Sequence, residues 1–135
     1  RIDLAVWGPP QQNPWMLEGM AVARRHVELL APVPRAPGPF AFEDLDYMRE
    51  ILNGAGFQGV DIIAAKGLLG GPGATPNQAQ QFACNAMAFG QVLLDYPESV
   101  QQAVQADLVE LYAKHNRADE GVMMGYTTWL VSARA

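Results

Sequence analysis

The segment Ile2-Asp3-Leu4-Ala5-Val6-Trp7-Gly8-Pro9 decides the expected fold. Its residues Leu4 to Trp7 are apolar without alternation, which is typical of a strand buried on both faces of a parallel sheet. The Gly8-Pro9 pair then ends the strand. A strand of this kind lies in the middle of a sheet and needs a partner along each edge. Because the sequence opens at Arg1, we expect a partner from outside this chain.

The next residues predict two helices joined by a stiff connection. Asn13, as an N-cap before Pro14, predicts a helix from residue 14 to about residue 30. The proline-rich residues 31–39 predict a surface connection that packs through its hydrophobic edges, which are Leu29, Leu30 and Phe40. A second helix is expected after Asp44, with an apolar face of Leu45, Met48, Ile51 and Leu52, and with Gly54 or Gly56 as its C-terminal stop.

A short strand over Val60, Ile62 and Ile63 follows, so the order strand, helix, helix, strand indicates an α/β sheet. The glycines of residues 67–74 lack the spacing of a phosphate-binding loop and predict a plain loop.

The second half of the sequence predicts an αα-hairpin between strands. Thr75-Pro76-Asn77-Gln78 has the pattern of a capping box, and the helix that it opens has an apolar stripe of Phe82, Ala86, Phe89 and Leu93. Pro97 opens another helix, which ends near Asn116 and buries Val100, Val104, Leu108 and Leu111. The segment Tyr126 to Val131 has strong strand propensity.

Composition excludes several classes of function. The 135 residues carry a net charge of -5, with 50% hydrophobic and 17% charged residues, which indicates a single globular unit over residues 1–135. Arg24-Arg25 is the one adjacent basic pair, so we expect no nucleic-acid partner. The sequence has no signal-peptide pattern and no apolar run of about 18 residues, which predicts no membrane partner and a cytoplasmic location.

Histidine and cysteine residues, which commonly bind metal or act in catalysis, are few. They are His26, His115 and the single cysteine, Cys84, without a His-x-x-x-His or Cys pair. We therefore predict no metal site, and Cys84 is expected to be a buried apolar residue. His26 is the better candidate for a general base, but both histidines fit structural roles, and no residue is assigned a catalytic role.

Aromatic and methionine side chains gather after the first strand. They are Trp7, Trp15, Met16, Phe40 and Phe42. Ligand pockets of open α/β sheets lie at the carboxyl ends of strands, so these residues predict a pocket for an apolar substrate. Each of them alone equally fits an ordinary core residue.

Several short motifs resemble one family in order and spacing. They are Ala5-Val6-Trp7-Gly8-Pro9, Asn13-Pro14-Trp15, Gly38-Pro39-Phe40-Ala41-Phe42, Ala55-Gly56-Phe57 and Trp129-Leu130-Val131-Ser132-Ala133-Arg134. The family is the class I S-adenosylmethionine-dependent methyltransferases related to the ubiquinone and menaquinone biosynthesis enzymes, and the resemblance covers essentially the whole chain.

The resemblance implies an α/β fold that is the C-terminal portion of a Rossmann-like sheet, with inserted helices. Residues 2–7 are similar to the fifth strand, 60–65 to the sixth and 121–133 to the seventh, which is inserted antiparallel between the other two. The Asp44 helix resembles the last crossover helix. Residues 13–39 and 75–115 resemble the insertions that cover the substrate.

The implied activity is methyl transfer to a small, apolar acceptor. The family holds S-adenosylmethionine through a Gly-rich turn after its first strand and an acidic residue ending its second, and neither motif occurs here. The resemblance therefore carries over no cofactor-binding residue, and this chain alone is expected to be inactive without an N-terminal half. Because such enzymes mainly align donor and acceptor, a dedicated acid or base is not required.

A second interpretation is a non-enzymatic α+β module that binds a ligand or forms a homodimer. An unpaired apolar strand edge invites association with a second copy. The two interpretations differ in what covers the strand from Leu4 to Trp7.

Overall fold

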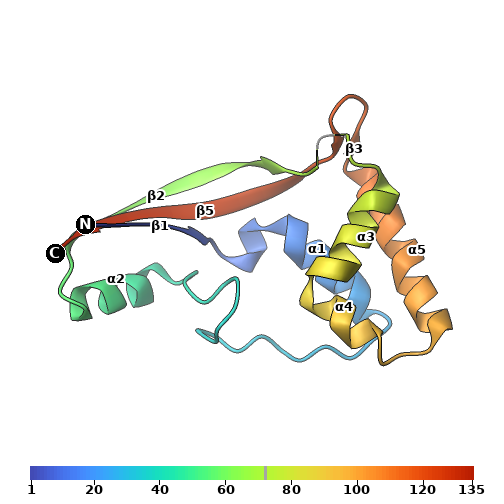
Figure 1. Cartoon of the computed structure of the whole chain (residues 1–135), viewed down its shortest axis with the longest axis horizontal. Helices are drawn as coiled ribbons and strands as arrows, with labels where there is room; N and C mark the ends of the chain where they lie inside the picture. Colours follow the sequence, from blue (N-terminus) through green and yellow to red (C-terminus); the bar gives the residue numbers. More distant parts are fainter. Residues whose placement is uncertain (72) are drawn as a thin grey trace. The chain divides into compact units, whose positions relative to one another are not determined.

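The computed structural model describes residues 1–71 and 73–135 and divides the chain into two compact units. Unit 1 comprises residues 1–13, 32–67 and 125–135, and unit 2 comprises residues 14–31 and 68–124. The chain is a mixed α/β protein with a three-stranded antiparallel sheet (Figure 1). At this level the α/β fold class expected from the sequence is confirmed.

Unit 1 is built on the three-stranded sheet. Its strands are β1 (Ile2–Trp7), β2 (Gln58–Leu69) and β5 (Met124–Arg134), in the order β1-β5-β2 (Figure 1). Strands β1 and β5 run antiparallel, with Leu4 opposite Val131 and Val6 opposite Trp129. The strand that is last in sequence therefore lies between two strands that precede it.

Helix α2 (Leu45–Gly54) follows the sequence pattern closely. Asp44 caps it, because its side chain accepts hydrogen bonds from the backbone N–H groups of Asp46 and Tyr47, and Gly56, with a φ of 87°, ends it. Met48 and Leu52 pack with Val131 into a core cluster that also contacts the β1 side chains Ile2, Leu4 and Val6. Of the predicted apolar face, Ile51 is exposed.

The sheet differs from the prediction in two respects. The expected burial of β1 on both faces is wrong, because Asp3 and Ala5 are exposed and only the face of Ile2, Leu4 and Val6 packs against α2. The expected short strand over residues 60–63 is twelve residues long. On the uncovered face, Ile63 and Leu130 are 59% and 45% exposed.

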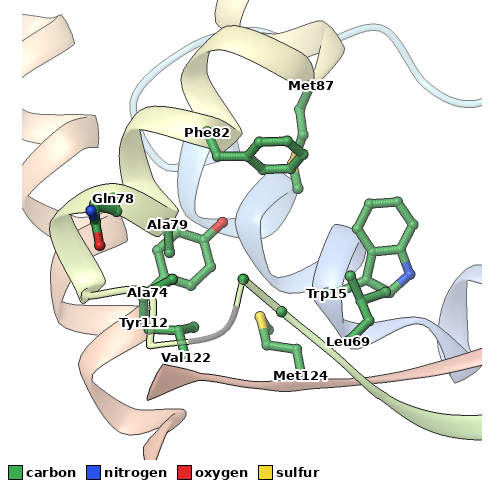
Figure 2. A pocket seen from close by; sticks show the side chains of 12 residues that line it. Trp15, Leu69, Ala74, Gln78, Ala79, Phe82, Met87, Tyr112, Val122 and Met124 are labelled. Atoms are coloured by element: carbon green, nitrogen blue, oxygen red, sulfur yellow. The ribbon is translucent and has the colours of Figure 1, made fainter. Parts of the chain in front are cut away.

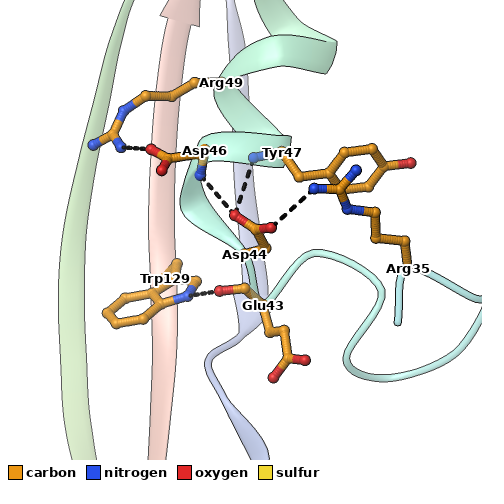
Figure 3. A network of polar contacts seen from close by, with 7 residues as sticks. All are labelled: Arg35, Glu43, Asp44, Asp46, Tyr47, Arg49 and Trp129. Carbon is orange, nitrogen blue, oxygen red and sulfur yellow. Dashed lines mark hydrogen bonds and ion pairs between the residues drawn. The ribbon is translucent and has the colours of Figure 1, made fainter. Parts of the chain in front are cut away.

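Polar contacts tie the proline-rich connection to the start of α2 (Figure 3). Arg35 donates to the Asp44 carboxylate at 3.2 Å and lies over the Tyr47 ring, 4.3 Å from its centroid. The Trp129 indole N–H donates to the Glu43 backbone oxygen at 3.1 Å. The backbone hydrogen bond from Tyr47, followed by the hydrogen bond from Arg35, lowers the pKa of Asp44.

Unit 2 is helical. Its helices are α1 (Pro14–Arg24), α3 (Pro76–Ala86), α4 (Ala88–Leu93) and α5 (Glu98–Lys114), and its short strands β3 (Asn116–Arg117) and β4 (Gly121–Val122) pair antiparallel. Helix α5 packs against both α1 and α3. The core draws on all four helices and on β4, with Ala23, Ala83, Phe89, Leu108 and Val122 among its buried members.

The helices of unit 2 are confirmed in kind but not in extent. The Thr75–Gln78 capping box is present, but the helix it opens breaks at Met87, where the backbone is extended. Phe82, which belongs to the predicted apolar stripe, is 63% exposed. The first helix ends at Arg24 rather than near residue 30, and Leu30 is 93% exposed instead of packing.

Two further boundaries differ from the sequence patterns. The predicted last strand, residues 121–133, divides into β4 and β5. The predicted glycine loop begins later, because Gly67 belongs to β2, and Pro72 lies outside the described residues. None of the helices in the part of the chain that the structure describes is long and apolar enough to cross a lipid bilayer.

Candidate functional site

Unit 2 contains an apolar pocket with a volume of about 390 Å³ (Figure 2). Its lining comes from α1, α3, α5 and the segments on either side of them: Trp15, Leu69, Gly70, Gly71, Ala74, Gln78, Ala79, Phe82, Met87, Tyr112, Val122 and Met124. Among the residues that the structure describes, none with a charged side chain lines it. Volume and lining are those of small-molecule sites, which are mostly apolar with a few polar groups.

The break between α3 and α4 shapes one wall. Pro76 and the capping box fix the first turn of α3, which places Ala79 and Phe82 on the pocket side (Figure 2). At Met87 the chain leaves the helix and then re-enters as α4, and the Met87 side chain lines the pocket. Gly90 permits this turn, because a Cβ there would overlap the Cys84 carbonyl oxygen.

The glycine-rich segment forms the opposite wall against β4. Gly70 and Gly71 line the pocket, the Gly73 N–H donates to Glu120, and the Val122 N–H donates to the Ala74 carbonyl at 2.9 Å. Gly121 has a φ of 82° and lies directly against Ala74, where a side chain would not fit. The segment thus serves close backbone packing beside an apolar cavity.

Tyr112 is the buried polar group of the pocket. It lies on α5, is 3% exposed, and burial raises its pKa to about 12. Gly19 of α1 leaves room for it, since a Cβ at Gly19 would come within 3.3 Å of the hydroxyl oxygen. Figure 2 shows the ring beside Ala79, with the hydroxyl directed away from the α5 backbone.

Two histidine–carboxylate pairs connect the region of α1 with that of α5: His26 follows α1, and His115 caps the C-terminus of α5. The His26 Nε2 lies 2.7 Å from Asp107, and the His115 Nε2 lies 2.7 Å from Glu18. The hydrogen bond from His26 lowers the pKa of Asp107. Neither histidine is among the described residues that line the pocket, and each pair links two segments of unit 2 that are far apart in the sequence.

The residues predicted to bind substrate are divided between the units. In unit 1, the Trp7 ring meets Tyr126 edge-on at 6.4 Å, Phe40 is half-buried, and Phe42 stacks on Tyr47 at 6.4 Å. In unit 2, Met16 is half-buried and Trp15 lines the pocket. Of the five predicted residues, Trp15 is the one that belongs to this cavity.

Sequence reasoning missed most of the lining. Tyr112 falls at helical spacing after Val104 and Leu108, but an aromatic residue at such a position equally fits a core. The sequence pattern places Phe82 in an apolar helical stripe, and it gives no strong signal for the break at Met87. Met124 follows the β3–β4 hairpin, whose strands have only two residues each and are too short to give a clear sequence pattern.

The chemistry of the lining does not fit S-adenosylmethionine. That molecule carries ammonium, carboxylate and sulfonium charges, and burying them in this pocket without charged or strongly polar partners would be costly. Residues 1–71 and 73–135 contain no group of three or more His, Cys, Asp or Glu side chains that could hold a metal ion. Cys84 is partly buried, which raises its pKa, and its sulfur accepts a hydrogen bond from Gln80.

Comparison with known proteins leaves the chain without an assigned family. No protein-family model matches it, and no curated protein is significantly similar to it.

Proposed function

We propose that this chain is the acceptor-binding, C-terminal part of a class I S-adenosylmethionine-dependent methyltransferase, acting on a small apolar acceptor in the cytoplasm. The donor would be bound by a segment other than the residues described here. The proposal starts from the resemblance of five sequence motifs to that family. It is supported by one feature of the fold and one of the pocket.

The observation that carries the proposal is the strand order β1-β5-β2. In the resembled family, the seventh strand lies antiparallel between the fifth and the sixth. Here β5, the last strand, has this place between β1 and β2, and it runs antiparallel to β1. Helix α2 follows β1 and precedes β2, as a crossover helix does. This arrangement agrees with the order of the sequence motifs.

The pocket supports the second half of the proposal. The resemblance assigns residues 13–39 and 75–115 to the cover over the substrate. Trp15 comes from the first of these segments, and Ala79, Phe82, Met87 and Tyr112 come from the second. An enzyme that works by aligning its reactants needs a shaped site from which water is excluded. The apolar side chains of this pocket can supply that part.

Two measurements test the proposal together. In the first, the chain is titrated calorimetrically with S-adenosylhomocysteine, and we expect no binding. In the second, the chain is mixed with a separately purified N-terminal segment of a class I methyltransferase of the resembled family. Transfer of radiolabelled methyl from S-adenosylmethionine to apolar acceptors is then followed, and we expect it only in the mixture.

Matched variants show whether transfer depends on the sheet. Ala5 is exposed on β1, and a lysine at a strand edge opposes pairing. Ala5→Lys should therefore abolish transfer in the mixture. Asn53→Lys, on an exposed position of α2, adds the same charge and should leave transfer intact. Binding of one S-adenosylhomocysteine per chain by the chain alone would contradict the proposal, as would equal activity of both variants.

A ligand-binding or dimerisation module is the second candidate. It is favoured by the uncovered sheet face, where Ile63 and Leu130 border a shallow hollow with Asp3 and Asp61. In the described residues, β1 also pairs with β5 alone. Sedimentation distinguishes the candidates: a dimer abolished by Ala5→Lys favours the module, whereas a monomer at all concentrations favours the methyltransferase part.

A further inference from the structure

The lining of the unit 2 pocket restricts the charge of its ligand. Its side chains are aromatic, aliphatic or thioether groups, and the polar atoms among the described residues belong to Gln78, Tyr112 and the indole N–H of Trp15. An ammonium or carboxylate group would lose its hydration there without gaining an opposite charge. The pocket is therefore suited to a neutral compound. Its volume of about 390 Å³ accommodates a molecule of ring size.

The side chains of Gln78 and Tyr112 differ in what they can offer a ligand. Gln78 is exposed, and its side-chain oxygen already accepts a hydrogen bond from the Thr75 N–H in the capping box. The Tyr112 hydroxyl, in contrast, has no hydrogen-bond partner in residues 1–71 and 73–135. An unpaired hydroxyl in an apolar surrounding is costly, so such groups are rare in folded proteins.

The Tyr112 hydroxyl is nevertheless reachable. Within the described residues, every side-chain nitrogen or oxygen that is fully removed from solvent has a hydrogen-bond partner. Since the Tyr112 hydroxyl has none, it keeps some accessible surface, and the pocket is the space that Tyr112 lines. The phenol is protonated at neutral pH, and burial raises its pKa further, to about 12. The group is thus a hydrogen-bond donor available to a molecule in the pocket.

We propose that the pocket of unit 2 binds a neutral, ring-sized apolar compound whose oxygen atom accepts a hydrogen bond from the Tyr112 hydroxyl. Trp15 and Phe82 supply aromatic surfaces for the ring, and Met87 and Met124 supply adaptable thioether contacts. Tyr112 acts as a specificity-determining residue, because it distinguishes an oxygen-bearing ring from the corresponding hydrocarbon. This inference deepens the proposed function, since it names the chemistry of the methyl acceptor.

The experiment compares three probes of nearly equal shape. They are 1-tetralone, which carries a carbonyl oxygen, its hydrocarbon tetralin, and the anion of tetralin-1-carboxylic acid. Affinities for the full chain are measured by NMR titration, which also reports where each probe binds. We expect 1-tetralone to bind roughly threefold to tenfold more tightly than tetralin, as one net hydrogen bond allows. The anion should bind more weakly than either.

Tyr112→Phe removes only the hydroxyl and is the deciding variant. It should bind tetralin as the unaltered chain does, while 1-tetralone loses its advantage. Unchanged tetralin affinity and an unchanged circular dichroism spectrum show that the pocket is intact. Phe82→Ala, at the exposed wall, should weaken both neutral probes alike.

Three results would overturn the inference. They are a failure of both neutral probes to bind at the pocket, equal affinities of 1-tetralone and tetralin, and a preference for 1-tetralone that survives in Tyr112→Phe. Since no methyl donor is present, these results are independent of methyl transfer. A failure of transfer with intact tetralone selectivity would count against the proposed function alone.

Discussion

Units 1 and 2 bury their apolar side chains in different ways. In unit 1, a hydrogen-bonded sheet fixes the geometry, α2 covers one face, and the other face leaves Ile63 and Leu130 exposed. In unit 2, four helices and a short hairpin converge on one core, and the geometry depends on how side chains fit. Sheet pairing tolerates an open face, whereas helix packing leaves a cavity where the fit is incomplete. The pocket lies in the unit of the second kind.

The largest effect is expected from breaking the core of unit 2. Phe89 on α4 is 1% exposed and lies within the core cluster. Phe89→Ala should lower the free energy of unfolding by about 3–5 kcal/mol, because it removes buried surface and leaves a cavity. Urea denaturation followed by circular dichroism measures this loss.

Phe82→Ala is the matched control for Phe89→Ala. Phe82 is 63% exposed at the pocket wall, so its removal should change the free energy of unfolding by no more than about 0.5 kcal/mol. Equal losses in the two variants would show that pocket and core are not distinct, and would contradict the comparison between them.

The buried Tyr112 hydroxyl should make the stability of the chain depend on pH. In unit 1, the Trp129 indole N–H finds the Glu43 carbonyl, whereas the Tyr112 hydroxyl lies in an apolar surrounding that raises its pKa from 10.0 to about 12. The unfolded chain ionises first, so this contribution to stability is complete below pH 10 and is lost as the pH rises toward 12. A shift of about two pKa units corresponds to roughly 2–3 kcal/mol.

Tyr112→Phe should lack this alkaline loss. Urea denaturation at pH values from about 9 to about 11.5 should show the variant losing less stability than the unaltered chain as the pH rises. Their free energies of unfolding are compared first below pH 10, where ionisation of Tyr112 contributes nothing. Parallel profiles of the two proteins above that pH would mean that Tyr112 ionises as freely in the folded chain as in the unfolded one.

Local signals in the sequence predicted the elements of both units well. Asp44 caps α2, Gly56 ends it and Thr75 opens α3, because caps and stops depend on a few neighbouring residues. The strand at Ile2 to Trp7 was located from its composition. The burial of this strand could not be predicted in the same way, because an apolar run does not show which of its faces another element covers.

Features that depend on residues far apart in the chain could not be predicted from local sequence patterns. The chain leaves the helix at Met87, between α3 and α4, although no proline is present there. The need for a glycine at position 90 is recognisable only from its closeness to the Cys84 carbonyl oxygen in the structure. The pocket brings together Trp15 and Tyr112, which are nearly a hundred positions apart in the sequence. Local sequence patterns do not predict contacts over such a separation. A polar atom without a partner, as in Tyr112, is recognisable only in three dimensions.

Asn13 offers the smallest and most selective test, on the side of unit 1. Its side chain is fully buried and bridges two chain segments: it donates to the carbonyls of Gly8, Pro9 and Thr127 at 3.0–3.1 Å and accepts from the Thr127 N–H at 3.0 Å. Asn13→Ala would leave these backbone groups unpaired and should lower the free energy of unfolding by about 1–3 kcal/mol. Asn53→Ala, on the exposed side of α2, should change it by no more than about 0.5 kcal/mol.

Because an amide does not ionise, the loss of stability in Asn13→Ala should be the same at neutral and alkaline pH, unlike the contribution of Tyr112. Urea denaturation at both pH values separates the two, and a loss at Asn13 no larger than that at Asn53 would mean that the bridge does not hold β1 to β5.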